Sequence, residues 1–251
     1  MIWRVLIACL VWALPANAEE VVAGMSQNRV SITANFDGSE ILIFGAVKRE
    51  APPSAGPLQV VITVSGPSEP IKVRRKARQY GIWINTDAVE VDAAPSFYAI
   101  ATSAEFGKTI SSIEDLRHHV SIPRAIRSVG APMTITDAET FTEALIRIRK
   151  DQGLYQVREN SVTLVEETLF DTRIALPANL TEGDYLTRIF LTRDGMVVDR
   201  YETNIDVRKV GLERFLFTLA RERPLVYGLM SLTIAILAGW SASAVFTYIR
   251  S

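Results

Sequence analysis

The sequence has very little cysteine. Its 251 residues contain one, Cys9, which lies in an N-terminal apolar segment. Removal of that segment would leave a chain with no disulfide, no thiolate nucleophile and no zinc–thiolate site. The stretch LIAC, which ends at Cys9, also resembles a lipoprotein processing site, but too little apolar chain precedes it for lipidation.

The sequence also lacks an excess of charge of either sign. It has 27 Lys and Arg against 28 Asp and Glu, which gives a formal net charge of -1. General nucleic-acid binding usually requires a basic surplus. We therefore expect no nucleic-acid partner.

Catalytic motifs are missing from the sequence as well. It contains no H-E-x-x-H, G-x-S-x-G, Walker or G-x-G-x-x-G pattern. Its two histidines, His118 and His119, are neighbours, so on a helix their side chains would point about 100° apart and would not bind one metal ion together. We expect no enzymatic activity, no catalytic residue and no metal or cofactor. A site made of carboxylates alone, such as a calcium site or a glycosidase pair, stays open.

Residues 1–18 have the pattern of a secretory leader. Arg4 precedes an apolar run over 5–14, and the small residues Ala16 and Ala18 then match a signal-peptidase site. We predict cleavage after Ala18. The alternative is that the segment is retained as an anchor, although its apolar run is short for a membrane span.

Residues 225–249 form a run of about 25 residues without a charge. A run of this length crosses a hydrocarbon core with some tilt. Tyr227, Trp240 and Tyr248 are aromatic residues of the kind found at membrane interfaces. We predict one membrane-spanning helix over 224–249.

The leader and the span together predict the side of the membrane. A cleaved leader exports the body, and the last helix then stops transfer and leaves a very short tail inside. The basic residues of 208–223 would lie outside, against the positive-inside tendency, but a large domain led by its own signal translocates largely regardless of such charges. The alternative places the body in the cytoplasm between two spans.

Small side chains recur at every fourth position of the predicted span. They would share one helix face, where another helix backbone can approach closely. We interpret this face as a packing surface for a second copy or for another membrane protein, although small residues are also common in spans generally. The residues are Ser231, Ala235, Gly239 and Ser243.

The segment between leader and span has mainly the pattern of β-strands. Short β segments with turn residues between them fill 19–104, and this spacing predicts an immunoglobulin-like β-sandwich. The period changes over 105–155, which predicts an insertion of two helices.

Strand patterns return over 156–208, with RDG at the tip of a hairpin. We favour a second, smaller β unit here, and the alternative is that these strands complete the first sandwich. Residues 209–223 then predict an amphipathic juxtamembrane helix, which lies either at the membrane interface or against the body.

The densest positive cluster lies in the stretch KVRRKAR. In a strand, alternation would place Lys72, Arg74 and Lys76 outward together. The plain interpretation is an exposed edge strand that charge protects from aggregation. The functional interpretation is contact with anionic lipid head groups or with an acidic partner. The full cluster is Lys72, Arg74, Arg75, Lys76 and Arg78.

The aromatic residues that follow this cluster are expected in the core. They are Trp83 in GIWIN and Phe97 and Tyr98 in PSFYAI. A ligand groove lined by them is the alternative.

Several stretches resemble the conserved alphaproteobacterial transmembrane family of the Alph_Pro_TM type. They are GMSQNRVSITANFDGSEILIFGA, YGIWIN and PSFYAIAT, together with the leader and the span; the F-x-G and FGA elements are Phe36, Gly38, Phe44, Gly45 and Ala46. The resemblance covers nearly the whole chain. It implies a periplasmic body held by a single span in a bacterial inner membrane, and association with sulfite-exporter-like permeases. It assigns no catalytic residues, because the family has no established activity.

These expectations lead to three functional hypotheses. The first is a membrane-anchored periplasmic β-sandwich protein that binds a partner, as accessory subunit of an inner-membrane transporter. The second is a module that binds or senses a small periplasmic ligand through the surface around Trp83 and Arg78. The third is an envelope enzyme with a carboxylate site.

Overall fold

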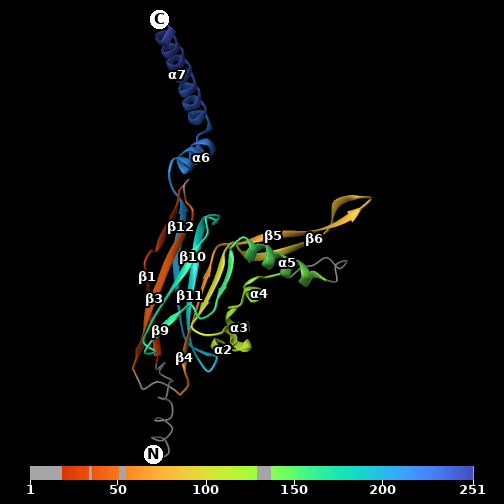
Figure 1. The fold of residues 1–251 in the computed structure, drawn as a ribbon, viewed down its shortest axis with the longest axis vertical. Helices are drawn as coiled ribbons and strands as arrows, with labels where there is room; N and C mark the ends of the chain where they lie inside the picture. Colours follow the sequence, from red (N-terminus) through yellow and green to blue (C-terminus); the bar gives the residue numbers. More distant parts are fainter. Residues whose placement is uncertain (1–18, 34–35, 51–54, 129–136, 251) are drawn as a thin grey trace, which may run out of the picture. The chain divides into compact units, whose positions relative to one another are not determined.

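The computed structural model of the chain describes residues 19–33, 36–50, 55–128 and 137–250. The described chain is mainly β, with several sheets, an insertion of helices and one C-terminal apolar helix (Figure 1). It divides into two compact units. The body comprises Met1–Val30 and Asp37–Val207, and the anchor unit comprises Ser31–Phe36 and Arg208–Ser251.

Four strands form the first sheet of the body, in the order β1–β3–β10–β9, with antiparallel neighbours. Every second residue of β10 is buried, as expected for a strand with one covered face. The strands are β1 Glu19–Met25, β3 Ser39–Arg49, β9 Thr163–Val165 and β10 Leu169–Leu176.

Six strands form the second sheet, in the order β2–β12–β11–β4–β7–β8, and its β7–β8 pair is parallel. In β4, six of the eight residues are buried, so both faces of this central strand are covered. The strands are β2 Arg29–Ile32, β4 Leu58–Ser65, β7 Tyr98–Thr102, β8 Tyr155–Arg158, β11 Gly183–Arg193 and β12 Met196–Lys209.

The structure corrects the expected separation of residues 156–208 as a second β unit. Strand β10 pairs along β3, and β11 pairs along β4, so the strands after the helical insertion complete both sheets begun before it. The RDG tip is where it was expected, because Asp194 and Gly195 turn β11 into β12 with φ angles of 49° and 76°.

The insertion contains four described helices rather than the two expected. Arg188 of β11 ties it to the second sheet: its guanidinium donates to the carbonyl oxygens of His118 (2.7 Å) and His119 (3.1 Å) and to the hydroxyl of Tyr98 (3.1 Å). The Tyr98 hydroxyl donates in turn to the carbonyl of Val120 at 2.9 Å. The helices are α2 Phe106–Thr109, α3 Ser112–His118, α4 Ile122–Ala125 and α5 Ala138–Asp151.

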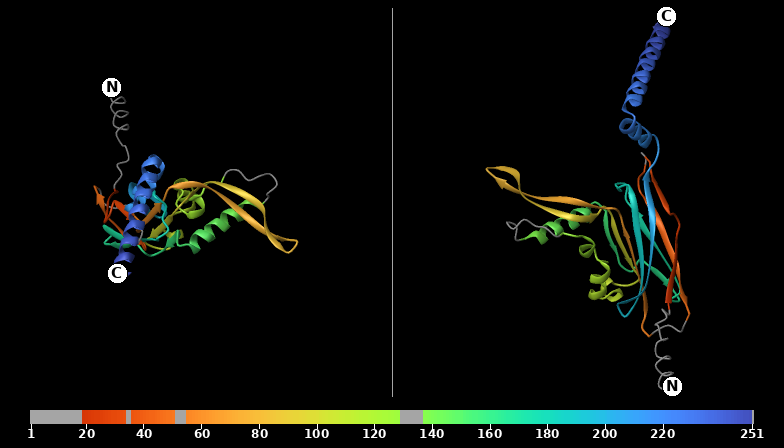
Figure 2. Two further views of the ribbon diagram at one scale, coloured as in Figure 1. Left: turned by 90° about the horizontal axis from the view of Figure 1, so that it is seen from above. Right: turned by 180° about the vertical axis from the view of Figure 1, so that it is seen from behind.

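The two remaining strands form a sheet of their own. Strands β5 Ser68–Gln79 and β6 Ile82–Pro95 make a long hairpin that projects from the body (Figures 1 and 2). We refer to residues 68–95 as the arm, and from here on the body means the rest of that unit. The anchor unit contains α6 Leu212–Glu222, inside the segment predicted as amphipathic, and α7 Pro224–Arg250.

Candidate functional site

The arm turns at Tyr80 and Gly81. Both residues have positive φ angles, 51° and 85°, and they connect the paired residues Gln79 and Ile82. Two-residue turns with two positive φ angles match the twist of a hairpin and favour glycine at the second position. The dipeptide YG is therefore the local sequence sign of this hairpin, and it is not one of the common Asn-Gly or Asp-Gly turn pairs.

The half of the arm nearest the body is packed. Val89 and Val91 of β6 are buried, and Ile71 and Val73, which pair with Val91 and Val89, are partly buried. Because these four residues lie on one face of the hairpin, that face continues the apolar packing of the body.

Helix α5 braces the middle of the arm through Arg75. The Arg75 guanidinium lies over the ring of Phe141, 4.8 Å from its centroid, and donates to the carboxylates of Asp137 at 2.5 Å and Asp87 at 3.0 Å. The hydrogen bond from Arg75 lowers the pKa of the Asp137 carboxyl. Arg75 therefore serves the arm's own structure, unlike the other members of the basic cluster.

Those other members share one face of the arm. In the register of the hairpin, Arg74 lies opposite Ala88, Lys76 opposite Asn85 and Arg78 opposite Trp83. All three cations are exposed, and within the described residues they make no ion pair. Lys72 continues the row toward the body, where it lies opposite Glu90. We call Lys72, Arg74, Lys76 and Arg78 the basic face.

The tip of the arm is apolar and aromatic. Tyr80 is fully exposed, and Ile82 and Trp83 are 64% and 68% exposed. The expectation that Trp83 belongs to the core is wrong, because Trp83 lies near the start of β6 at the tip of the arm, and this strand reaches the packed region only at Val89. Phe97 and Tyr98 are fully buried, as expected. Trp83 is thus exposed on the arm while this aromatic pair is buried, so among the described residues the three side chains do not share one surface.

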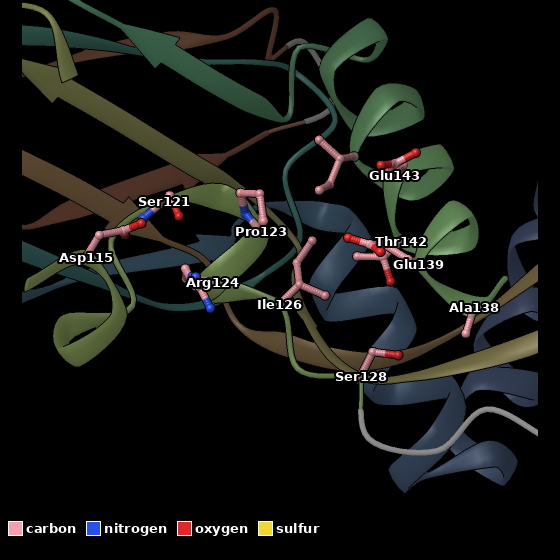
Figure 3. A pocket seen from close by; sticks show the side chains of 11 residues that line it. Asp115, Ser121, Pro123, Arg124, Ile126, Ser128, Ala138, Glu139, Thr142 and Glu143 are labelled. Atoms are coloured by element: carbon pink, nitrogen blue, oxygen red, sulfur yellow. The ribbon is translucent and has the colours of Figure 1, made fainter. Parts of the chain in front are cut away.

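A pocket lies between α4 and α5, away from the arm's tip. Its volume is about 760 Å³, within the range of small-molecule sites. Figure 3 shows Glu139, Thr142 and Glu143 on α5, and Asp115, Ser121 and Arg124 on the facing segments. The Asp115 carboxylate accepts a hydrogen bond from the Ser121 amide at 2.6 Å, so it is already engaged in the fold.

The histidines occupy structural positions. His118 lies 3.3 Å from a carboxylate oxygen of Glu114 and packs on the ring of Phe190, while His119 ends α3 in the left-handed conformation. In the described part of the chain, no group of three or more His, Cys, Asp or Glu side chains is arranged to hold a metal ion.

Helix α7 carries the predicted small-residue face. Its residues Pro224–Ser243 are long and apolar enough to cross a membrane, and the described structure leaves them uncovered. A side chain added at Gly239 would meet no atom within 4 Å. The face consists of Ser231, Ala235, Gly239 and Ser243, one turn of helix apart.

Comparison with known proteins identifies a family and finds similar solved structures. The model of the Alph_Pro_TM family, described as "Putative transmembrane protein", matches residues 20–248. No curated protein matches the chain. Among solved structures, the sporulation control protein Spo0M from Bacillus subtilis aligns over 80% of this chain and 54% of its own, with 9% identity and a TM-score of 0.27. This chain thus spans about half the length of that protein.

Proposed function

The chain belongs to the Alph_Pro_TM family of transmembrane proteins, and from this premise we propose that it is a membrane-anchored binding protein, the accessory subunit of an inner-membrane transporter. Its body would lie in the periplasm, and a sulfite-exporter-like permease is the partner class that the family resemblance favours. An immunoglobulin-like arrangement of the body is part of the proposal, supported by the two main sheets with a shared buried core.

The uncovered surface of α7 is the observation that carries this proposal. Among the described residues, the apolar window Pro224–Ser243 of this helix is left uncovered, so its surface is available to lipid or to another helix. Close approach between helices in lipid needs small side chains in register. The Ser231–Ser243 face provides them, and the open space beside Gly239 leaves room for a neighbouring backbone.

Leucine substitutions in α7 test the proposal. Ala235→Leu and Gly239→Leu fill the small-residue face, so we expect the partner to be lost when the tagged protein is purified from its native membrane. Thr233→Leu and Ser241→Leu are the matched controls, because the helical period places these residues on the opposite side of α7. Retention of the partner by both test variants, with the body still folded, would contradict the proposal.

The pocket between α4 and α5 supports a second candidate function. A small polar ligand bound there would make the protein a periplasmic binding or sensing module, at a place other than the Trp83 and Arg78 surface first considered. We expect such a ligand to raise the unfolding temperature of the protein, and Thr142→Leu to abolish the increase by filling the pocket. An unfolding temperature unmoved by any anion or metabolite tested would argue against this candidate.

A further inference from the structure

The arm emerges at the end of the second sheet where β11 begins and β12 ends. Its base follows Pro67, and a side chain added at Gly183 would come within 2.9 Å of the Pro67 ring. Gly183 in turn pairs with Val207 of β12, the last residue of the body. Only residues 208–211 separate Val207 from the start of α6. The arm therefore begins at the end of the sheet from which the chain continues to the apolar helix.

The arm has the composition of a membrane-surface contact. Its 12-residue strand β5 gives it a length of about 40 Å. The basic face runs along it, and Tyr80, Ile82 and Trp83 project from its tip. Tyrosine and tryptophan prefer the interface between head groups and acyl chains, while lysine and arginine beside them attract anionic head groups.

We propose that the arm docks on the anionic lipid surface of the membrane that holds α7, with the tip at the head-group level and the basic face on the lipid phosphates. This inference goes beyond the proposed binding of a transporter, because it requires no protein partner.

Two features favour lipid over an acidic protein surface as the occupant. The tip exposes apolar and aromatic side chains on both faces of a two-stranded ribbon. A protein interface of standard size needs a broader surface than such a ribbon offers. The distal cations lie opposite Ala88, Asn85 and Trp83 and form no ion pair with any described residue, so they present a row of exposed charges.

A dye at the tip of the full-length protein tests the docking. In a background with Cys9→Ser, Tyr80→Cys is labelled with an environment-sensitive fluorophore. The protein is then reconstituted in vesicles of phosphatidylcholine alone or of phosphatidylcholine with phosphatidylglycerol. The control label is Lys108→Cys in α2, an exposed position at the other end of the second sheet, near Thr192.

We expect the tip dye, but not the control dye, to shift to the blue and to be quenched by lipid-borne nitroxide when phosphatidylglycerol is present. Each cation near an anionic surface strengthens binding roughly fivefold, so Arg74→Gln, Lys76→Gln and Arg78→Gln together should weaken docking roughly a hundredfold. The matched charge control, Lys48→Gln, Arg173→Gln and Arg200→Gln, removes three exposed cations from the body and should leave the shift intact.

A tip dye that stays in water on both kinds of vesicle overturns the proposal, and so does insertion that ignores phosphatidylglycerol and the triple substitution. If the dye is shielded only when native membrane proteins are added, the arm binds a protein and the lipid assignment is wrong. Because the vesicles contain no transporter, a negative result here would overturn lipid docking of the arm without bearing on the proposed partner of α7.

Discussion

The Glu19 carboxylate and the Arg193 guanidinium form a two-point ion pair that joins the two main sheets. Arg193 donates from Nε to Oε2 at 2.8 Å and from Nη2 to Oε1 at 2.7 Å. The Glu19 side chain is fully buried and that of Arg193 is 6% exposed, and Arg49 donates a third bond to the same carboxylate at 2.9 Å. Because Glu19 is the first residue of β1, this pair fixes the start of that strand to β11.

Removal of the Glu19 charge should destabilise the body. Glu19→Gln leaves Arg193 buried without its main partner, and breaking a buried pair in this way costs about 3–5 kcal/mol. Urea denaturation of the detergent-solubilised protein, followed by the circular dichroism of the sheets, measures the loss. Glu20→Gln is the control, because its partner Lys48 is exposed, and it should change the free energy of unfolding by less than about 1 kcal/mol.

The same pair predicts a dependence of stability on pH. The hydrogen bond from Arg193 holds the pKa of Glu19 below its ordinary 4.5. A lowered pKa in the folded state means that the stabilisation is fully present above pH 4.5 and is lost as the pH falls through the folded-state pKa. The unfolding temperature should therefore decrease below pH 4.5, and the decrease should be smaller in Glu19→Gln. An equal decrease in both proteins would show that other groups control it.

Gly45, in the FGA element, should not tolerate a side chain. A methyl group there would lie 2.8 Å from the Val22 carbonyl oxygen and would collide with the Phe170 ring. Overpacking of this kind costs about 1–3 kcal/mol, so Gly45→Ala should unfold at a lower urea concentration. Gly107→Ala is the control, because no atom lies within 4 Å of the added methyl. Equal stability of the two variants would mean that the sheet adjusts to the methyl.

Loss of the Arg75 brace should loosen the outer arm without unfolding the body. Arg75 and Asp137 are each 42% exposed, so Arg75→Gln should cost the body less than about 1 kcal/mol. A two-stranded hairpin alone is only marginally stable, and amide hydrogen exchange over 76–85 should accelerate. Arg74→Gln, on the opposite face, should leave exchange unchanged. If exchange in Arg75→Gln were unchanged, the outer arm would be held in place by its own cross-strand pairs and not by Arg75.

The sequence was sufficient for features that depend on local pattern. The uncharged run of 225–249 marks α7 because composition alone determines whether a helix is apolar. Alternation likewise placed Lys72, Arg74 and Lys76 on one exposed face. Trp83 shows what a local pattern cannot determine, because a strand that projects from the body and a strand inside it can have the same alternation of apolar and polar residues. The pairing of Glu19 with Arg193, 174 residues apart, depends on sheet order, which no local pattern contains.

The central claim, that α7 binds another membrane protein through its small-residue face, is tested most directly by photocrosslinking in the native membrane. A photoreactive side chain is placed at Ala235, and the same side chain at Thr233 on the opposite side is the control. We predict that Ala235 gives a discrete product containing a multi-span membrane protein, and that Thr233 does not. A product of two copies of this chain alone, or equal products from both positions, would contradict the account.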